Sequence, residues 1–275
     1  MRFLCFLLLA PALLSSTALA GSYGISDNII GAEFLNEFVH DAIPDPTHGR
    51  VSAKSDFCSG NTFVILADST TVLAPNGPGR NSVRIRSQKT YITHVSVFNI
   101  VHMPEGCGTW PAVWETATTN WPNLGEVDIN STTPGIYGPL FNDNRGGWYA
   151  MERTDNFIKV WFWPRSAGNV PAEVRSGALG INTDSWGRPS AFFPNTQCDL
   201  KVHFGPNNVI INLTFCGDWA GQPGIFIITG LGVMAYANEN PRVFEEAYWQ
   251  FNAVRVFLQS PKYYPLSVTS NLNQI

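Results

Sequence analysis

Charged residues are scarce in this chain, and its one long apolar run lies within the first twenty residues. Asp, Glu, Lys and Arg make up 14% of the 275 residues, against about 25% in an average soluble domain. Helices usually depend on charged residues for their outer faces, so this scarcity favours strands. The net charge of −4 gives no electrostatic reason to expect nucleic acid or an anionic membrane as a partner.

Several catalytic motifs are missing from the sequence. It has no Gly-x-Ser-x-Gly elbow, no His-Glu-x-x-His pair and no phosphate-binding loop. The histidines His94, His102 and His203 lack metal-ligand spacing, so we expect neither a metal nor another cofactor. Aromatic residues, in contrast, are abundant: they make up 13% of the chain and include nine Trp. Such a composition suits a flat, uncharged ligand, because aromatic faces stack on it.

Residues 1–20 have the features of a secretory signal peptide. Arg2 supplies the positive end, residues 3–14 form the apolar run, and Ala18-Leu19-Ala20 is a small-residue cleavage site. A membrane anchor is the alternative, but the run is shorter than the roughly 20 residues that a spanning helix needs. We therefore expect a mature chain that begins at Gly21, is secreted to the extracellular space or cell wall, and does not associate with membranes.

Short alternating or apolar runs between Gly and Pro residues predict an all-β sandwich or barrel. The runs span residues 83–86, 91–101, 158–163, 209–213, 225–229 and 251–257. The best helical candidates are residues 28–38 and 241–246. With no repeat or linker in view, residues 21–275 are predicted to form a single monomeric domain, with 259–275 as a loosely attached tail.

Four of the five cysteines follow the signal peptide: Cys58, Cys107, Cys198 and Cys216. An even number in a secreted chain suggests two disulfides. Residues 199–204 and 209–215 are predicted to form a hairpin, which would place Cys198 opposite Cys216. By elimination, Cys58 would then pair with Cys107.

The segment 125–130 places polar groups at alternate positions. On a strand, Glu126, Asp128 and Asn130 share one face, about 6.6 Å apart at neighbouring Cα atoms. Two carboxylates so close raise the proton affinity of at least one of them. Aromatic rings for stacking on sugars lie nearby in the sequence, at Trp110, Trp114 and Trp121. The pattern predicts a sugar-binding cleft, and an ordinary exposed sheet face is the alternative.

Two triplets are acceptor sequences for N-linked glycans: Asn130-Ser131-Thr132 and Asn212-Leu213-Thr214. The second triplet lies in a predicted strand. Such triplets often stay unmodified, so the use of both remains open.

Longer motifs surround these residues. They are His102-Met103-Pro104-Glu105-Gly106-Cys107-Gly108-Thr109-Trp110-Pro111-Ala112, Trp121-Pro122, Gly125-Glu126-Val127-Asp128-Ile129, Gly79-Arg80-Asn81-Ser82-Val83-Arg84, Phe215-Cys216-Gly217-Asp218-Trp219 and Glu246-Ala247-Tyr248-Trp249. Together they resemble glycoside hydrolase family 16, in particular its fungal endo-β-1,3(4)-glucanases. The resemblance implies a β-jelly roll of two stacked antiparallel sheets (concanavalin A-like), a β-glucan partner, and retaining hydrolysis of its O-glycosidic bonds.

The family motif is Glu-x-Asp followed, after one or two residues, by a second Glu. The resemblance implies that Glu126 is the nucleophile and that Asp128 assists it. The position of the second Glu, the general acid/base, falls on Asn130 or Ser131. Neither an amide nor a hydroxyl donates a proton to the leaving oxygen as a carboxylic acid does. General acid catalysis is worth about 10² to 10⁴ in rate, so hydrolysis depends on restoring this group.

Three interpretations stay open: an endo-glucanase, a catalytically impaired β-glucan-binding protein, and a structural secreted domain. The fungal relatives carry a long segment after the motif, whereas here residues 132–136 lead almost at once into Tyr137. The chain is therefore either a degenerate relative or a sequence that lacks a coding segment near Asn130. Glu115 and Glu152 are the carboxylates to examine as substitutes for the missing acid.

Overall fold

The computed structural model describes residues 21–41, 49–50, 52–53, 56–77, 79–117, 134–222, 224–225 and 232–259. A larger sheet contains β1 (Ser22–Ile29), β5 (Asp56–Ser59), β6 (Thr62–Leu66), β8 (His94–His102), β10 (Gly147–Arg153), β11 (Phe157–Pro164), β12 (Gly180–Asn182), β13 (Ala191–Pro194) and β15 (Tyr248–Gln259). A smaller sheet contains β2 (Phe38–His40), β3 (Gly49–Arg50), β4 (Ser52–Ala53), β7 (Asn81–Ser87), β9 (Thr109–Thr116) and β14 (Asn208–Cys216). The helices are η1 (Gly31–Glu33), α1 (Phe34–Glu37), α2 (Pro139–Asp143), α3 (Ala172–Ser176), η2 (Thr183–Ser185), α4 (Leu200–His203), α5 (Gly217–Ala220), α6 (Val233–Glu239) and η3 (Pro241–Phe244).

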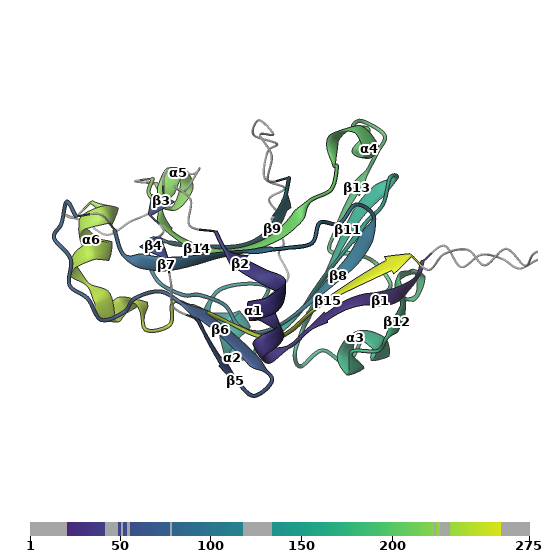
Figure 1. The fold of residues 1–275 in the computed structure, drawn as a ribbon, viewed down its shortest axis with the longest axis horizontal. Coiled ribbons are helices and arrows are strands. Elements are labelled where there is room, and N and C mark those ends of the chain that lie inside the picture. Colours follow the sequence, from purple (N-terminus) through teal and green to yellow (C-terminus); the bar gives the residue numbers. More distant parts are fainter. Residues whose placement is uncertain are drawn as a thin grey trace, which may run out of the picture.

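The two sheets lie one above the other, with the short helices around them (Figure 1). The larger sheet has the strand order β12-β1-β15-β8-β10-β11-β13, with β6 on β15 and β5 on β6. The smaller sheet has the order β2-β7-β14-β3, with β9 on β14 and β4 on β7. The short β4–β7 pair is parallel, whereas the other strand pairs, such as β14–β9 and β15–β8, are antiparallel. The result is the two-layered antiparallel sandwich that the sequence predicts.

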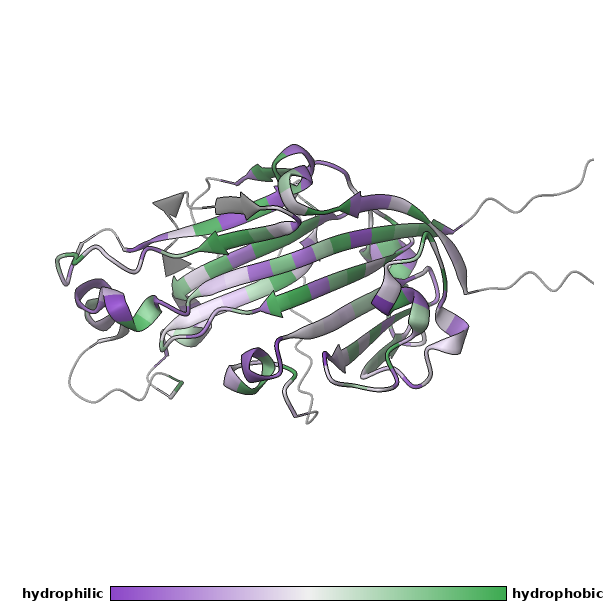
Figure 2. Ribbon diagram, turned by 90° about the horizontal axis from the view of Figure 1, so that it is seen from below, coloured by the Kyte–Doolittle hydropathy of each residue, from purple (hydrophilic) through white to green (hydrophobic). Residues whose placement is uncertain are grey.

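The main core lies between the sheets. Phe98 and Ile100 of β8 face Val209 and Ile211 of β14 across the sandwich, and all four are at most 7% exposed. The strands of the two sheets carry both apolar and polar residues (Figure 2), and the direction of successive side chains alternates between the two faces of a strand. The alternation therefore assigns every strand an inner and an outer face.

The larger sheet buries its outer face as well. Val95 and Val97 of β8 point away from the main core because they alternate with Phe98 and Ile100. They join a second buried cluster whose large members are Trp148, Trp161, Trp163 and Trp186. Val174 on α3, Val170 just before it and Trp186 directly after η2 belong to the same cluster, so these parts of the chain cover the sheet from outside.

Most predicted strands are confirmed, but the predicted strand at residues 199–204 is wrong. Those residues begin with Asp199, whose carboxylate accepts a hydrogen bond from the Lys201 amide at 3.1 Å and caps α4. The predicted helix at 28–38 is shorter than expected, because residues 22–29 form β1 and only residues 31–37 are helical. Residues 226–229, 1–20 and 260–275 lie outside the described residues.

Neither predicted disulfide is present among the described residues, where Cys107 and Cys198 are exposed free thiols. Without a hairpin there is no geometric reason for Cys198 to meet Cys216. Cys216 instead lies at the far end of β14, which pairs with β7 and β9. The pairing of Cys107 with Cys58 was inferred by elimination, so it loses its support together with the first one. The side chain of Cys58 lies outside the described residues.

None of the helices in the described part of the chain is long and apolar enough to cross a bilayer.

Candidate functional site

Strand β9 places Trp110 and Trp114 on the outer face of the smaller sheet. Val113, which alternates with Trp114, packs against the main core, so the two indoles point away from the larger sheet. Trp110 lies beside Thr214 of β14, and Trp114 lies beside Ile210. Both rings are half-buried, and they form the centre of an aromatic surface that begins on β9.

Contacts with β14 and β7 hold the Trp114 indole. Its Nε1 donates a hydrogen bond to Asn212 Oδ1 at 2.7 Å. The Arg84 guanidinium lies 5.2 Å from the ring centroid, within the range of a cation–π contact. The indole is therefore fixed at its edge and along one face.

Asp41 and two arginines add charge to the same face. The Asp41 carboxylate accepts a hydrogen bond from Arg84 Nε at 3.1 Å, and Arg86 Nε lies 3.8 Å from it. Arg84 is opposite Asn212 in the register of β7 and β14. The alternation in Asn81-Ser82-Val83-Arg84-Ile85-Arg86 could have placed both arginines on the outer face, but sequence reasoning did not single them out.

Trp219 extends the aromatic surface beyond β9. It lies on α5, directly after β14, with its ring centroid 5.8 Å from that of Trp110. Its side chain is 50% exposed. An exposed aromatic ring that adjoins another ring marks a candidate contact surface. Sequence reasoning quoted the motif that contains Trp219 without assigning the residue a role.

The predicted catalytic residues lie outside the described residues, which break off after 117 and resume at 134. This applies to Glu126, Asp128, Asn130 and Trp121, and their roles stay predictions. The segment that holds them begins directly after β9 ends at Thr116. Within the described ranges, β9 pairs with β14 alone.

Glu115 does not share the face of the two indoles. It alternates with Trp114 and points between the sheets, where its Oε1 lies 2.8 Å from His94 Nε2. Its Oε2 lies 3.5 Å from Arg153 Nη1. Burial lowers the pKa of the Arg153 guanidinium, and the charge of Glu115 opposes that shift. Glu115 therefore belongs to a buried charge cluster and does not replace the missing acid.

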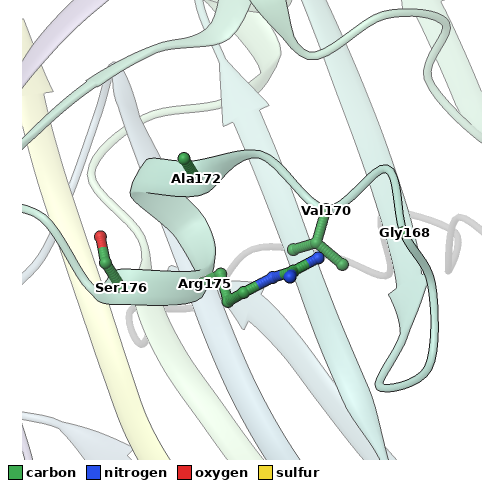
Figure 3. A pocket seen from close by; sticks show the side chains of 5 residues that line it. All are labelled: Gly168, Val170, Ala172, Arg175 and Ser176. Atoms are coloured by element: carbon green, nitrogen blue, oxygen red, sulfur yellow. The ribbon is translucent and has the colours of Figure 1, made fainter.

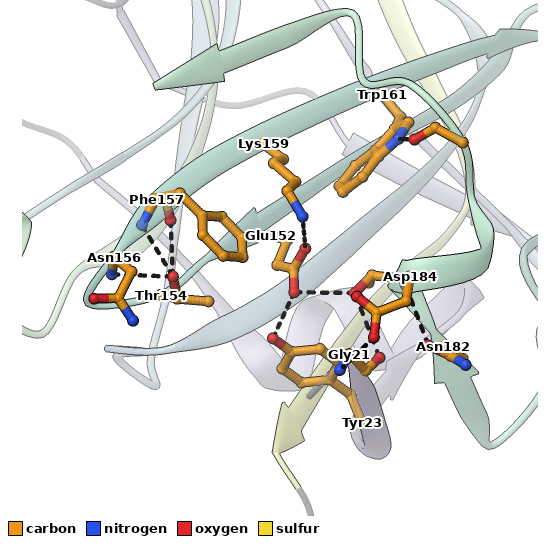
Figure 4. A network of polar contacts seen from close by, with 12 residues as sticks. Gly21, Tyr23, Glu152, Thr154, Asn156, Phe157, Lys159, Trp161, Asn182 and Asp184 are labelled. Carbon is orange, nitrogen blue, oxygen red and sulfur yellow. Dashed lines mark hydrogen bonds and ion pairs between the residues drawn. The ribbon is translucent and has the colours of Figure 1, made fainter. Parts of the chain in front are cut away.

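Glu152 is even further from the aromatic surface. It lies on the outer face of the larger sheet, 2% exposed, and accepts hydrogen bonds from Tyr23 Oη at 2.7 Å and Thr183 Oγ1 at 3.0 Å. Lys159 Nζ is 3.7 Å away (Figure 4). Burial, and next the Glu152 carboxylate, raise the pKa of Tyr23 well above its usual range. Glu152 is thus a structural acceptor.

A shallow hollow beside α3 is the other surface feature of note (Figure 3). Its lining includes Val170, Ala172 and Arg175. Arg175 Nη2 donates to the Ala167 carbonyl at 3.1 Å, and no carboxylate is among the lining residues. The hollow lies on the covered side of the larger sheet, so it takes no part in the aromatic surface.

Comparison with known proteins identifies the family. The profile described as "XgeA-like, catalytic GH16 domain" matches residues 38–133 and 129–257. A probable endo-1,3(4)-beta-glucanase of Aspergillus niger is 34% identical over 307 residues, covering 87% of this chain and 40% of that protein. The endo-1,3(4)-beta-glucanase of Emericella nidulans is 30% identical, covering 86% and 48%. The chain therefore spans less than half the length of either curated relative.

A solved structure resembles the whole fold. Laminarinase 16A from Phanerochaete chrysosporium, a GH16 protein with β-glucans in its donor and acceptor sites, is 47% identical. The two structures superpose with a TM-score of 0.81, over 86% of this chain and 100% of the other. This similarity confirms the predicted jelly roll and the predicted family resemblance.

Proposed function

The chain belongs to glycoside hydrolase family 16, and from that membership we propose that the intact gene product is a secreted retaining endo-β-1,3(4)-glucanase. A fold hosts many functions, so the proposal depends on the site. The observation that carries it is the aromatic outer face of the smaller sheet. There, Trp110 and Trp114 lie on the strand that leads directly into the segment with Glu126 and Asp128.

Each acidic residue would have a separate task in the reaction. Glu126 attacks the anomeric carbon and forms a covalent glycosyl-enzyme, while Asp128, two residues away on the same face, assists it. A second carboxylic acid, about 5 to 5.5 Å from the first, protonates the leaving oxygen and later activates water. Asn130 has no proton to give at this step, so turnover requires a carboxyl group that the written sequence does not place there.

The comparisons support a missing internal segment as the reason. The family profile matches in two pieces that overlap at residues 129–133, the position where the sequence departs from the motif. The Aspergillus niger alignment extends over 307 residues, which is longer than the 275-residue chain. That relative therefore has residues without a counterpart here. In our proposal the lost segment carries the acid/base Glu and the strand that follows it.

Transcript sequencing across residues 128–137 tests the missing segment directly. We expect additional in-frame codons, including one for Glu within two residues of Ile129. The protein with the restored segment should release reducing sugar from laminarin and lichenan, and the chain as written should release at least about 10²-fold less. A transcript identical to the written sequence, together with an inactive protein, would exclude the hydrolase.

Glucan binding without hydrolysis is the second candidate, because the aromatic surface does not depend on the missing acid. Retention on insoluble β-glucan tests it with the chain as written. Trp110→Ala should lower retention about tenfold, as expected for truncating a central Trp. Trp186→Phe, in the covered cluster, serves as the matched control and should bind like the parent. Equal retention of the Trp110→Ala protein would contradict a role for this surface.

Export and the monomeric state belong to the same proposal. The apolar run, followed by Ala18-Leu19-Ala20, supports cleavage after residue 20. N-terminal sequencing of protein from the culture medium should begin at Gly21. Light scattering should give the mass of one chain, and a dimer mass would require a revised account of the exposed surfaces.

A further inference from the structure

Asn212 is the acceptor residue of a glycosylation triplet, yet it lies in the middle of the smaller sheet. Strand β14 pairs with β7 on one side and β9 on the other, and Asn212 is opposite both Arg84 and Ala112. Its side chain points to the outer face, because it alternates with the inward-facing Ile211 and Leu213. Only 8% of the residue is exposed.

Both polar ends of the Asn212 side chain are in use. Oδ1 accepts the Trp114 indole hydrogen bond at 2.7 Å, and Nδ2 donates to Thr214 Oγ1 at 3.2 Å. An N-linked glycan would be attached to that same Nδ2 and needs open space above it. Here the indole and the Thr214 hydroxyl occupy the surroundings of the amide, so a glycan is incompatible with this arrangement.

We propose that Asn212 is a positioning residue for the glucan-binding surface, rather than a glycosylation acceptor. It acts through Trp114, whose indole it holds by the edge while Arg84 lies against one face. Asp41 in turn holds Arg84. A ring that is already fixed loses little conformational freedom when a sugar stacks on it, and this preorganisation raises affinity. The inference rests on the proposed glucan-binding function.

The first test is a double-mutant cycle on the full chain, read as the Kd for laminarihexaose. Asn212→Leu removes the acceptor, and we expect affinity to fall about two- to tenfold, the usual range for one hydrogen bond. Asn212→Asp retains an acceptor oxygen for the indole and should stay within about twofold of the parent. In a Trp114→Phe background, which lacks the indole N–H, Asn212→Leu should cause no further loss.

Asn208 provides the matched control. It lies on β14, is 2% exposed, and donates from Nδ2 to the carbonyls of Ser87 at 2.7 Å and Lys89 at 3.1 Å. Asn208→Leu should lower thermal stability as much as Asn212→Leu or more, without changing the Kd. An equal loss of affinity in both variants, or an Asn212→Leu effect that persists in the Trp114→Phe background, would overturn the proposal.

Two further measurements do not depend on a ligand, so they separate this inference from the proposed function. The indole N–H signal of Trp114, assigned by its disappearance in Trp114→Phe, should be protected from hydrogen exchange in the parent and unprotected in Asn212→Leu. Mass spectrometry of protein secreted from a fungal host should find the Asn212 peptide unmodified. An unprotected parent indole or a glycan on Asn212 would refute the positioning role, even if the protein binds glucan.

Discussion

The outer faces of the two sheets both carry tryptophans at alternate strand positions, but they have different surroundings. On the larger sheet, Trp148, Trp161 and Trp163 are 2% to 5% exposed, beneath α3 and beneath Trp186, which follows η2 and is 5% exposed. On the smaller sheet, Trp110 and Trp114 are half-buried, and the adjacent Trp219 is 50% exposed. Similar sequence patterns thus produce a second core on one face and a candidate binding surface on the other.

The rings of the covered cluster pack against one another. Trp186 packs edge-on against Trp161 and Trp163, with centroid distances of 5.2 and 5.6 Å and interplanar angles of 83° and 85°. In edge-to-face packing, the positive edge of one ring contacts the negative face of another. The favourable electrostatic contacts of these rings are therefore made within the protein. Aromatic content in the sequence therefore overestimates the binding surface, because these four of the nine tryptophans stabilise the fold.

Trp161→Ala should have the largest effect on stability. The side chain is 2% exposed, and truncation of a buried Trp costs about 3 to 5 kcal/mol through lost burial and the cavity left behind. Urea denaturation followed by circular dichroism measures the change. The folded fraction should retain its affinity for β-glucan. A loss below about 1 kcal/mol, or a selective loss of glucan binding, would break the distinction between the two faces.

Glu152→Ala should have the next largest effect. The substitution leaves Tyr23 Oη and Thr183 Oγ1 without their buried acceptor, at a cost of about 1 to 3 kcal/mol. Glu152→Gln retains an acceptor oxygen and should cost less, which makes it the matched control. Chemical denaturation compares the two variants, and equal losses would mean that the hydrogen bonds are unimportant.

Alkaline pH should destabilise the covered face through Tyr23. Its folded-state pKa is raised, so the folded protein retains a proton that the unfolded chain loses above about pH 10. The stabilising contribution is complete below that pH and is lost as the pH rises above it. The dependence of unfolding free energy on pH should be less steep in Tyr23→Phe, by up to about 1.4 kcal/mol per pH unit. Identical slopes in Tyr23→Phe and the parent would exclude this linkage.

Trp219→Ala should have the smallest effect on stability, within about 0.5 kcal/mol, because the side chain is half exposed. Its contact with Trp110 nevertheless connects it to the aromatic surface. We expect reduced retention on insoluble β-glucan, smaller than the loss in Trp110→Ala. A stability loss comparable to that of Trp161→Ala would show that both faces are structural.

Much of the fold was predictable because strand signals are local. The runs that became β7, β8, β11, β14 and β15 all show the alternation or apolar character that the structure realises. The predicted hairpin is wrong because Asp199 caps a helix. The sequence of the residues that follow Asp199 does not distinguish this helix from a strand. Register between distant strands, such as β9 beside β14, depends on contacts about a hundred residues apart, which a local pattern does not contain.

The candidate site was predictable to a similar extent. The sequence alone identified the family and the aromatic residues Trp110 and Trp114, whereas the acids predicted around Glu126 lie outside the described residues and stay predictions. These features belong to short sequence motifs, which are recognised without knowledge of the fold. Neither Arg84 nor Trp219 was recognised, since each reaches the aromatic surface only through the pairing of strands or the turn after β14.

The amino-acid order thus determined most of the strands and the family, because both depend on patterns of neighbouring residues. Only the tertiary structure decided which tryptophans are covered, where Glu115 and Glu152 point, and that Asn212 holds an indole. The physical reason is that burial and hydrogen bonding depend on what packs against a residue from elsewhere in the chain. A strand pattern specifies two faces, and the rest of the protein determines which of them meets solvent.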